Sequence, residues 1–235
     1  MLVIRSIIKN KLLTAMSDSD FAMLDAGLTP VDLPRGLNLM FAGEPIAHCY
    51  FLEDGIASMV AMTREGHEAE AAIIGIDGMA DVSTILGQES SPLRCNIQIG
   101  GHGYRLPARV LTAAYDASPT LRLQLNSLAF AVLAQIAQTA LVNASFSIEE
   151  RLARWLLMCA DRLVGDDIHM THEFLALMLN VRRAGVTLAM QSLLGAGLLG
   201  TTRGVIRIVD RAGLEEFAHD AYDPAATESA LRCAS

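Results

Sequence analysis

The stretch "THEFLALMLNVRRAGVTLAMQSLLGAGLLGTTRGVIRIVD", from Thr171 to Asp210, decides the fold of this 235-residue chain. Thr171 is a good helix cap, and the apolar side of a short helix follows it. Asn180 stands where the chain would leave that helix in a left-handed conformation, which asparagine tolerates. A longer helix is predicted from about Arg182 to Leu194, and the segment after it predicts two strands joined at Arg203–Gly204. A short helix, a tight turn, a longer helix and a β-hairpin together form a winged helix-turn-helix.

The charge of the chain is unevenly distributed. Residues 1–150 carry nine Lys and Arg against sixteen Asp and Glu, whereas residues 151–211 carry eight Arg against five acidic residues. The motif therefore lies in a module of net charge +3, within a chain of net charge −8. Arg182 and Arg183 stand together at the head of its longer helix. A locally basic module attached to an acidic body favours a polyanionic partner.

The composition is that of a compact globular protein, with 52% hydrophobic and 19% charged residues. The four cysteines lie too far apart for a zinc site or an iron–sulfur cluster, and they fit reduced thiols in a cytosol. No signal peptide is recognisable, so we expect a cytoplasmic protein. His169 and His172 could in principle hold a metal, but a solvated turn is the favoured interpretation. We therefore predict neither a metal nor a cofactor. The cysteines are Cys49, Cys95, Cys159 and Cys233.

The first half of the chain reads as a β domain. From about Val31 to Leu106 the sequence predicts short strands, with a glycine about every ten residues, which indicates an all-β sandwich or barrel. A short helix capped by Ser17 or Ser19 is expected before these strands, and a helix begins after Pro107. We place a first, sensor-like domain at residues 1–116.

A long helix is predicted next, from near Pro119 to about Ala144, and we assign residues 117–145 to it. Residues 123–148 carry no charge, a run long enough to span a bilayer. Five side-chain amides in that run are costly in lipid, so we favour a helix buried in protein. Ser147 then predicts the cap of a further helix.

The long helix has two apolar faces. One follows the 4-3 spacing of a coiled-coil seam, and the other covers a second side. A helix with two such faces needs two partners: its own β domain and, most economically, a second copy of the chain. We expect the seam to form a two-fold dimer; the alternative is the core helix of a monomer. The seam comprises Leu121, Leu125, Leu128, Val132, Gln135, Thr139 and Val142, and the second face comprises Leu123, Phe130, Leu133, Ala134, Ala137 and Leu141.

Three stretches in order resemble the Crp/Fnr family of bacterial transcription regulators. "AGEPIAHCYFLEDG" (42–55) is similar to the glycine-spaced β-roll of that family, and "LARWLLMCADRL" (152–163) and the opening stretch are similar to its winged helix-turn-helix. The likeness covers nearly the full chain. It implies an α+β protein with an N-terminal jelly-roll-like β-roll of the cyclic-nucleotide-binding-domain fold, a dimerisation helix and a DNA-binding domain at residues 146–235. It also implies a homodimer, a palindromic site in double-stranded DNA, and RNA polymerase as a further partner.

The resemblance also implies roles for individual residues. Arg182 and Arg183 would stand at the start of the recognition helix, where guanidinium groups reach a guanine edge or a phosphate. Thr171 and, at the wing tip, Arg203 would meet the DNA backbone. Family members commonly have another residue pattern after the arginine, so their operator does not carry over. The outward face of the recognition helix here comprises Arg183, Ala184, Thr187, Leu188 and Gln191, of which Thr187, Leu188 and Gln191 are further candidates for base contacts.

The β-roll departs from the cyclic-nucleotide-binding members of the family. Those members follow a glycine with a glutamate that holds the ribose, but here Gly78 is followed by Met79. Arg94 matches the arginine for the cyclic phosphate, although Cys95 replaces its hydroxyl neighbour. Arg94 is therefore only a weak effector-binding candidate, and we expect a regulator that does not depend on cyclic AMP.

A sensor that contacts protein and an enzyme are the alternatives to a DNA-binding regulator. A small-molecule or redox sensor could use its C-terminal module for protein contacts rather than for DNA, as the outward Ala184 and Leu188 would allow. An enzyme with its active site in the β-roll is not supported, because the sequence has no His-x-His set, nucleophile elbow or close carboxylate pair there. We therefore predict no catalytic residues.

Overall fold

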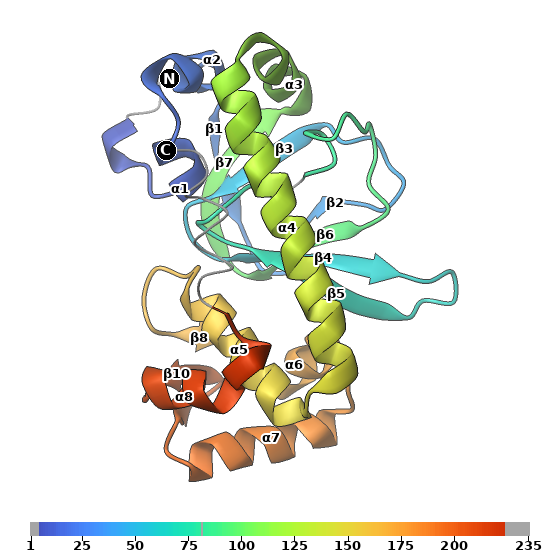
Figure 1. Cartoon of the computed structure of the whole chain (residues 1–235), viewed down its shortest axis with the longest axis vertical. Coiled ribbons are helices and arrows are strands. Elements are labelled where there is room, and N and C mark those ends of the chain that lie inside the picture. Colours follow the sequence, from blue (N-terminus) through green and yellow to red (C-terminus); the bar gives the residue numbers. More distant parts are fainter. Residues whose placement is uncertain (1–4, 81, 224–235) are drawn as a thin grey trace.

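The computed structural model describes residues 5–80 and 82–223, and Cys233 of the predicted reduced thiols lies outside these ranges. A β domain forms one end of the molecule and a helical module the other, while the long helix α4 (Pro119–Ser145) runs along both (Figure 1). The predicted α+β class is confirmed. Cys49, Cys95 and Cys159 are buried, and no disulfide joins them.

The β domain consists of two antiparallel sheets with the strand orders β1-β7-β3 and β2-β6-β4-β5. Its core lies between them and contains Phe51, Met59, Ile97 and Leu106, each at most 2% exposed. Gly103 permits close approach of two strands, because a Cβ there would lie 2.2 Å from the Phe51 carbonyl oxygen. The predicted short strands are confirmed as β1 (Thr29–Leu33), β2 (Asn38–Met40), β3 (His48–Leu52), β4 (Ile56–Met62), β5 (Glu68–Ile74), β6 (Arg94–Ile99) and β7 (Gly101–Pro107).

Short helices close the far end of this domain. Ser17 caps α2 by accepting a hydrogen bond from the Asp20 backbone N–H, which settles the choice between Ser17 and Ser19. The buried Asp20 carboxylate in turn accepts hydrogen bonds from Ser118 and Thr120 at the start of α4. These bonds fix the start of the long helix. The elements here are η1 (Arg5–Ile7), α1 (Lys11–Thr14), α2 (Asp18–Asp25) and α3 (Ala108–Ala117).

The two apolar faces of α4 have the reverse of the roles that we expected. The 4-3 seam, predicted to face a second chain, is the inward face: its five aliphatic residues are at most 5% exposed. The second face is open, with Phe130 70% and Leu133 61% exposed. Seam spacing is equally suited to packing on a β domain, so spacing alone did not identify which face meets the chain's own core. The inward residues are Leu121, Leu125, Leu128, Val132 and Val142.

Of the helices within the described ranges, α4 is long and apolar enough to cross a membrane by length and composition. Two of its side-chain amides hydrogen-bond to other parts of the protein. Gln124 Nε2 donates to the Leu12 carbonyl oxygen at 3.0 Å. Gln135 binds the backbone of Ile73 twice, accepting from its N–H at 2.6 Å and donating to its carbonyl at 3.1 Å. These bonds tie α4 to the β domain, in agreement with the prediction of a helix buried in protein.

The helical module follows α4. The α5 helix begins with a capping box in which Ser147 and Glu150 each bond the other's backbone N–H, as the predicted cap requires. A three-stranded sheet of order β8-β10-β9 lies beside the helices. The elements are α5 (Ile148–Ala160), β8 (Ile168–His169), α6 (His172–Met178), α7 (Arg183–Gly195), β9 (Leu199–Thr202), β10 (Val205–Ile208), α8 (Arg211–Ala218) and η2 (His219–Ala221).

The module packs directly on the β domain. Ile56, Ile73 and Ile99 of the β domain belong to the same buried apolar cluster as the core of the module. The buried Glu70 carboxylate accepts a hydrogen bond from Trp155 Nε1 at 2.7 Å and another from the Ser58 hydroxyl. A continuous core and a buried polar contact therefore connect the two ends of the molecule.

Candidate nucleic-acid interface

The helix-turn-helix is formed as the sequence predicts. Thr171 caps α6, because its hydroxyl accepts a hydrogen bond from the Phe174 backbone N–H at 3.4 Å. Asn180 has a φ of 49°, the left-handed conformation expected at the turn. The second helix of the motif, α7, begins at Arg183, with Arg182 as its N-cap. Figure 1 shows α7 lying across the end of the molecule that is farthest from α2 and α3.

The inward side of α7 holds it against the module. Val186, Ala189, Met190 and Leu193 are at most 1% exposed. Gly185, which lowers helix propensity by up to about 1 kcal/mol relative to alanine, lies close to α5. A Cβ at this position would be 3.0 Å from Ile148 Cδ1. Close packing of the two helices therefore accounts for a glycine inside the recognition helix.

The outward side of α7 presents most of the predicted contact residues to solvent. Arg182, Arg183, Leu188 and Gln191 are exposed, and Leu188 reaches 64%. Thr187 differs: it is half-buried, and its hydroxyl donates to the Arg183 carbonyl oxygen at 3.1 Å.

The Thr187 hydroxyl also lies 3.2 Å from His172 Nδ1 on α6. This link could not be predicted from the sequence, because nothing in the spacing of His172 and Thr187 signals that α6 and α7 bring them together. A hydroxyl already engaged twice is less available to a ligand than the side chains of Arg183 and Gln191.

The wing is a β-hairpin with a two-residue turn. Thr202 pairs with Val205, so Arg203 and Gly204 form the tip. Both have positive φ values, 48° and 80°, which is the pattern of a type I′ turn. Arginine rarely adopts this conformation, and here it places an exposed guanidinium at the tip of the wing. The predicted hairpin junction is confirmed.

The arginines of the module fall into two groups. Five have partners within the protein: a backbone carbonyl oxygen for Arg151, a hydroxyl for Arg154 and carboxylates for Arg162, Arg207 and Arg211. The other three, Arg182, Arg183 and Arg203, are exposed, and no side chain in the described ranges bonds to their guanidinium groups. The net charge of +3 counted from the sequence therefore does not show where the unpaired positive charges lie. All three unpaired arginines lie on the turn, the recognition helix or the wing.

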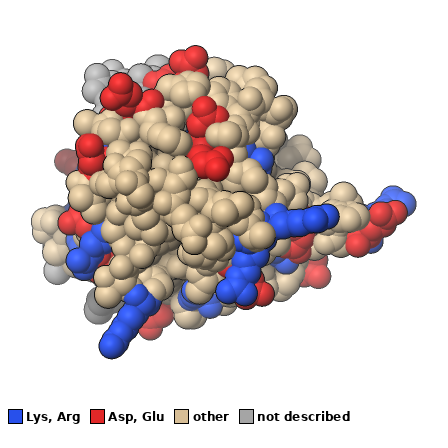
Figure 2. All heavy atoms as spheres, turned by 90° about the horizontal axis from the view of Figure 1, so that it is seen from below, with Lys and Arg blue, Asp and Glu red and all other residues tan. Residues whose placement is uncertain are grey.

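Figure 2 shows the end of the molecule below α7. Lys and Arg side chains stand singly or in small groups around this face rather than in one continuous basic patch, and acidic side chains lie above and among them. Such a surface favours contacts at a few defined points over general attraction to a polyanion.

The effector candidate Arg94 lies in the β domain and is already paired. Its Nη2 is 2.6 Å from Glu68 Oε2. Met79 is fully buried and forms an isolated β-bridge with Phe51. The interior is thus apolar at the position where cyclic-nucleotide-binding relatives carry a carboxylate, and Arg94 forms an ion pair with Glu68.

The comparisons with known proteins agree with this geometry. Residues 150–217 match the family model of the Crp-like helix-turn-helix domain. No curated protein sequence matches the chain. Among solved structures, a putative Crp/Fnr transcriptional regulator from Eubacterium rectale is 17% identical, with a TM-score of 0.67 over 89% of this chain and 98% of that one.

Two further structures align over most of their length. FixK2 from Bradyrhizobium japonicum is 17% identical, with a TM-score of 0.69 over 81% of this chain and 96% of that one. A regulator from Xanthomonas campestris described as c-di-GMP responsive is 13% identical, with a TM-score of 0.64 over 83% of this chain and all of that one. Residues 150–217 are therefore a Crp-like helix-turn-helix domain, and the chain as a whole has the fold of the Crp/Fnr family of transcriptional regulators.

Proposed function

We propose that this protein is a dimeric, sequence-specific DNA-binding transcription regulator of the Crp/Fnr type that inserts α7 into the major groove. The observation that carries the proposal is the position of the three unpaired, exposed arginines, Arg182, Arg183 and Arg203, on the elements that face DNA in a winged helix-turn-helix. Regulation of transcription, rather than catalysis, is the activity of the family whose fold the chain has.

Each contact residue has a proposed role. Arg183 lies in the first turn of α7, where a bidentate guanidinium can read a guanine edge. Arg182, at the N-cap, pairs with a phosphate that the helix N-terminus also attracts. Arg203 at the wing tip and Thr171 at the start of α6 contact the backbone and position the module. Gln191, Leu188 and Thr187 are further candidates for base contacts.

A second copy of the chain completes the proposed assembly. Its contact is the open face of α4, where Leu123, Phe130, Leu133 and Leu141 are each at least 52% exposed. We keep the domain division proposed from the sequence: a β-roll at 1–116, a dimerisation helix at 117–145 and a DNA-binding domain at 146–235. A dimer places its recognition helices about 34 Å apart, which is one helical turn of DNA. The preferred site is then a palindrome, and the proposed setting is the cytoplasm, with RNA polymerase as a further partner.

The regulator does not depend on cyclic AMP in this proposal. Met79 fills the place of the ribose-binding carboxylate, and Arg94 already pairs with Glu68. Proteins of this fold include the c-di-GMP-responsive regulator from Xanthomonas campestris and a putative cAMP-binding regulatory protein from Silicibacter pomeroyi, so fold alone does not select an effector.

Selection from random double-stranded DNA tests the function directly. Repeated rounds with the purified full-length protein should enrich an inverted repeat whose half-sites are centred about 10 base pairs apart. Recovery of only unrelated sequences would contradict the proposal. Capture of a protein partner through the exposed Leu188 face would then favour the alternative, a sensor whose C-terminal module contacts protein.

A further inference from the structure

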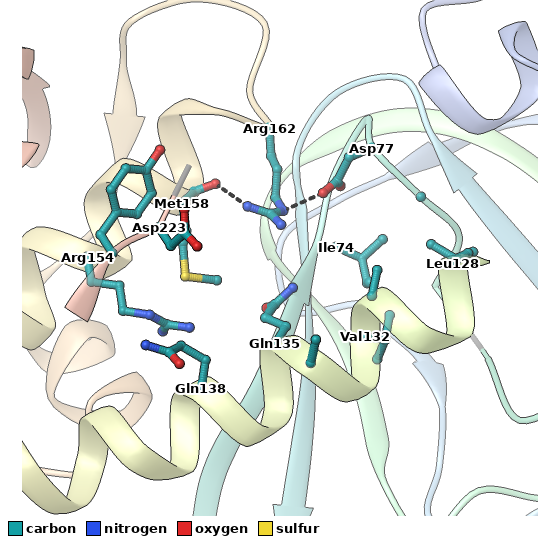
Figure 3. Close-up of a pocket in the computed structure, with 14 residues that line it drawn as sticks. Ile74, Asp77, Leu128, Val132, Gln135, Gln138, Arg154, Met158, Arg162 and Asp223 are labelled. Carbon is teal, nitrogen blue, oxygen red and sulfur yellow. Dashed lines mark hydrogen bonds and ion pairs between the residues drawn. The ribbon is translucent and has the colours of Figure 1, made fainter. Parts of the chain in front are cut away.

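A cavity lies where the end of β5, the middle of α4 and the helix α5 meet (Figure 3). Its volume, counted as the space open to the centres of water molecules, is about 70 Å³. One water needs about 10–15 Å³ by this measure, so the cavity has room for several waters or one small organic molecule. It joins surfaces from the β-roll and from the DNA-binding module.

One side of the cavity is apolar. Ile74, Leu128 and Val132 lie together there, and Met158 lies across from them on α5 (Figure 3). These side chains offer no hydrogen bond to water, so they favour an occupant with an apolar portion.

The other side holds a buried cation without a carboxylate partner. Arg154 is 8% exposed, and its guanidinium points into the space between α4 and α5 (Figure 3). Its hydrogen bond in the described part of the chain runs from Nη2 to the Thr139 hydroxyl at 3.2 Å. No carboxylate in the same part of the chain lies within 4.0 Å of it, unlike Arg162, whose Nε is 2.8 Å from Asp77. A buried cation is unfavourable unless an anion pairs with it.

Neighbouring groups do not fully supply that anion. Glu70 attracts Arg154 electrostatically, but its carboxylate accepts hydrogen bonds from Ser58 and Trp155 rather than from Arg154. Burial raises the pKa of the Glu70 carboxyl to about 7, so it is only partly charged at neutral pH. Burial lowers the pKa of Arg154 to about 10, which leaves the guanidinium protonated at neutral pH. Asp223 lines the cavity from an exposed position and lies more than 4.0 Å from the Arg154 guanidinium.

The amide side chains of the cavity have partners already. Gln135 bonds the backbone of Ile73, and Gln138 Nε2 donates to the Asp220 carbonyl oxygen at 3.2 Å. Arg154 is therefore the group best placed to select a ligand.

We propose that this cavity binds a small organic acid, whose carboxylate pairs with the Arg154 guanidinium and whose short apolar chain lies against Leu128, Val132 and Ile74. The planar guanidinium matches a carboxylate with two parallel hydrogen bonds. An inorganic oxyanion would satisfy the same charge but would leave the apolar side in contact with water. Because the site is built from β5, α4 and α5, an occupant touches both ends of the molecule at once.

Titration of the full-length protein with butanoate tests this proposal. Trp155, the single tryptophan, follows Arg154 in the chain and hydrogen-bonds to Glu70, so its emission reports on this region. Calorimetry on the same samples measures binding that leaves the emission unchanged. Butanoate should bind saturably at millimolar or lower concentration. 1-Butanol lacks the charge-assisted hydrogen bond and inorganic phosphate lacks the apolar contact, so each should bind at least about ten-fold more weakly than butanoate.

Two matched pairs of variants locate the site. Arg154→Met keeps the side-chain volume but removes the charge, and the exposed Arg64→Met is its control. Ala131→Leu fills the cavity on α4, and Ala140→Leu, at an exposed position on the same helix outside both apolar faces, is its control. Arg154→Met and Ala131→Leu should weaken butanoate binding about ten-fold or more, and the controls should stay within about two-fold.

Three results would overturn the proposal: no binding by either method, equal binding of phosphate, or unchanged affinity in both cavity variants. If Arg154→Met fails to fold, as judged by circular dichroism, the Ala131→Leu pair still decides the outcome. No DNA is present in these measurements, so their failure leaves the proposed DNA binding untouched.

Discussion

Arg182 and Arg183 are neighbours in sequence, but they occupy different positions at the start of α7. Arg182 is the N-cap and has extended backbone dihedrals, whereas Arg183 is the first helical residue. Arg182 therefore lies just outside the helical turns, whereas Arg183 lies on the outward face of the helix. We expect this difference in position to appear as a difference in DNA recognition.

Arg183→Ala should cost about 1–3 kcal/mol of binding free energy and relax selectivity at one position in each half-site. Arg182→Ala should instead weaken binding to all sequences about equally and flatten the dependence on salt. Anisotropy titrations over a panel of single-base variants, repeated at several salt concentrations, separate these effects. An identical loss for both variants on every sequence would show that neither residue reads a base.

Glu70 predicts a pH dependence of stability. Burial raises its pKa from 4.5 in the unfolded chain to about 7 in the folded protein. The folded state therefore binds the proton more tightly, and the stability that this supplies is present below pH 4.5 and is lost as the pH rises toward 7. The loss should be on the order of 3 kcal/mol, since one pKa unit corresponds to about 1.4 kcal/mol.

Urea unfolding at about pH 5 and about pH 8 measures this change. Glu70→Gln cannot ionise and should remove most of the difference between the two conditions. The control is Glu65→Gln, because Glu65 is exposed in the β4–β5 hairpin and should leave the difference intact. The same pH difference in wild type and Glu70→Gln would assign it to other groups.

Cyclic AMP should bind weakly or not at all. Its ribose would meet the buried Met79 instead of a carboxylate, and its phosphate would have to displace Glu68 from Arg94. Calorimetry should show no micromolar affinity. A dissociation constant at or below that range would mean that the β-roll rearranges to create a site.

The helix α4 shows what the sequence predicted about an element and what it did not. Its existence, length and two apolar faces follow from periodicity and from the absence of charge. The side that meets the β-roll does not follow, because Leu121 and Leu133 are equally apolar and differ only in their tertiary surroundings. Caps were easier to predict: Ser17, Thr171 and Ser147 act locally, and each caps its helix as expected.

The open face of α4 should hold two chains together. Leu133→Asp places a charge in the proposed contact and should convert the dimer to a monomer, because burying an unpaired carboxylate is unfavourable. Leu86→Asp is the control, since Leu86 is 60% exposed and Leu133 61% exposed, but Leu86 lies in the β5–β6 connection. Sedimentation should give about twice the 25.2 kDa chain mass for wild type and control. A wild-type monomer at micromolar concentration would remove the basis for a palindromic site.

The distribution of charge over the whole molecule limits how the protein can bind DNA. The acidic β-roll repels a polyanion. The DNA-binding module attracts a polyanion through three unpaired arginines per chain rather than through a continuous basic surface. Non-specific affinity should therefore be low and should fall steeply with salt. The basic module could be predicted from the sequence. Which of its arginines are already paired, and so unavailable to DNA, could not be, as the ion pairs of Arg207 and Arg211 show.

The most direct test of the account is a binding titration of the Arg182→Ala/Arg183→Ala double variant against a DNA site selected with the wild-type protein. Arg64→Ala, in the β4–β5 hairpin, is the matched control. The account predicts that the double variant loses at least about ten-fold in affinity, or about 1.4 kcal/mol, together with selectivity, and that the control binds as wild type does. Unchanged affinity and selectivity in a folded, dimeric double variant would show that α7 does not enter the groove.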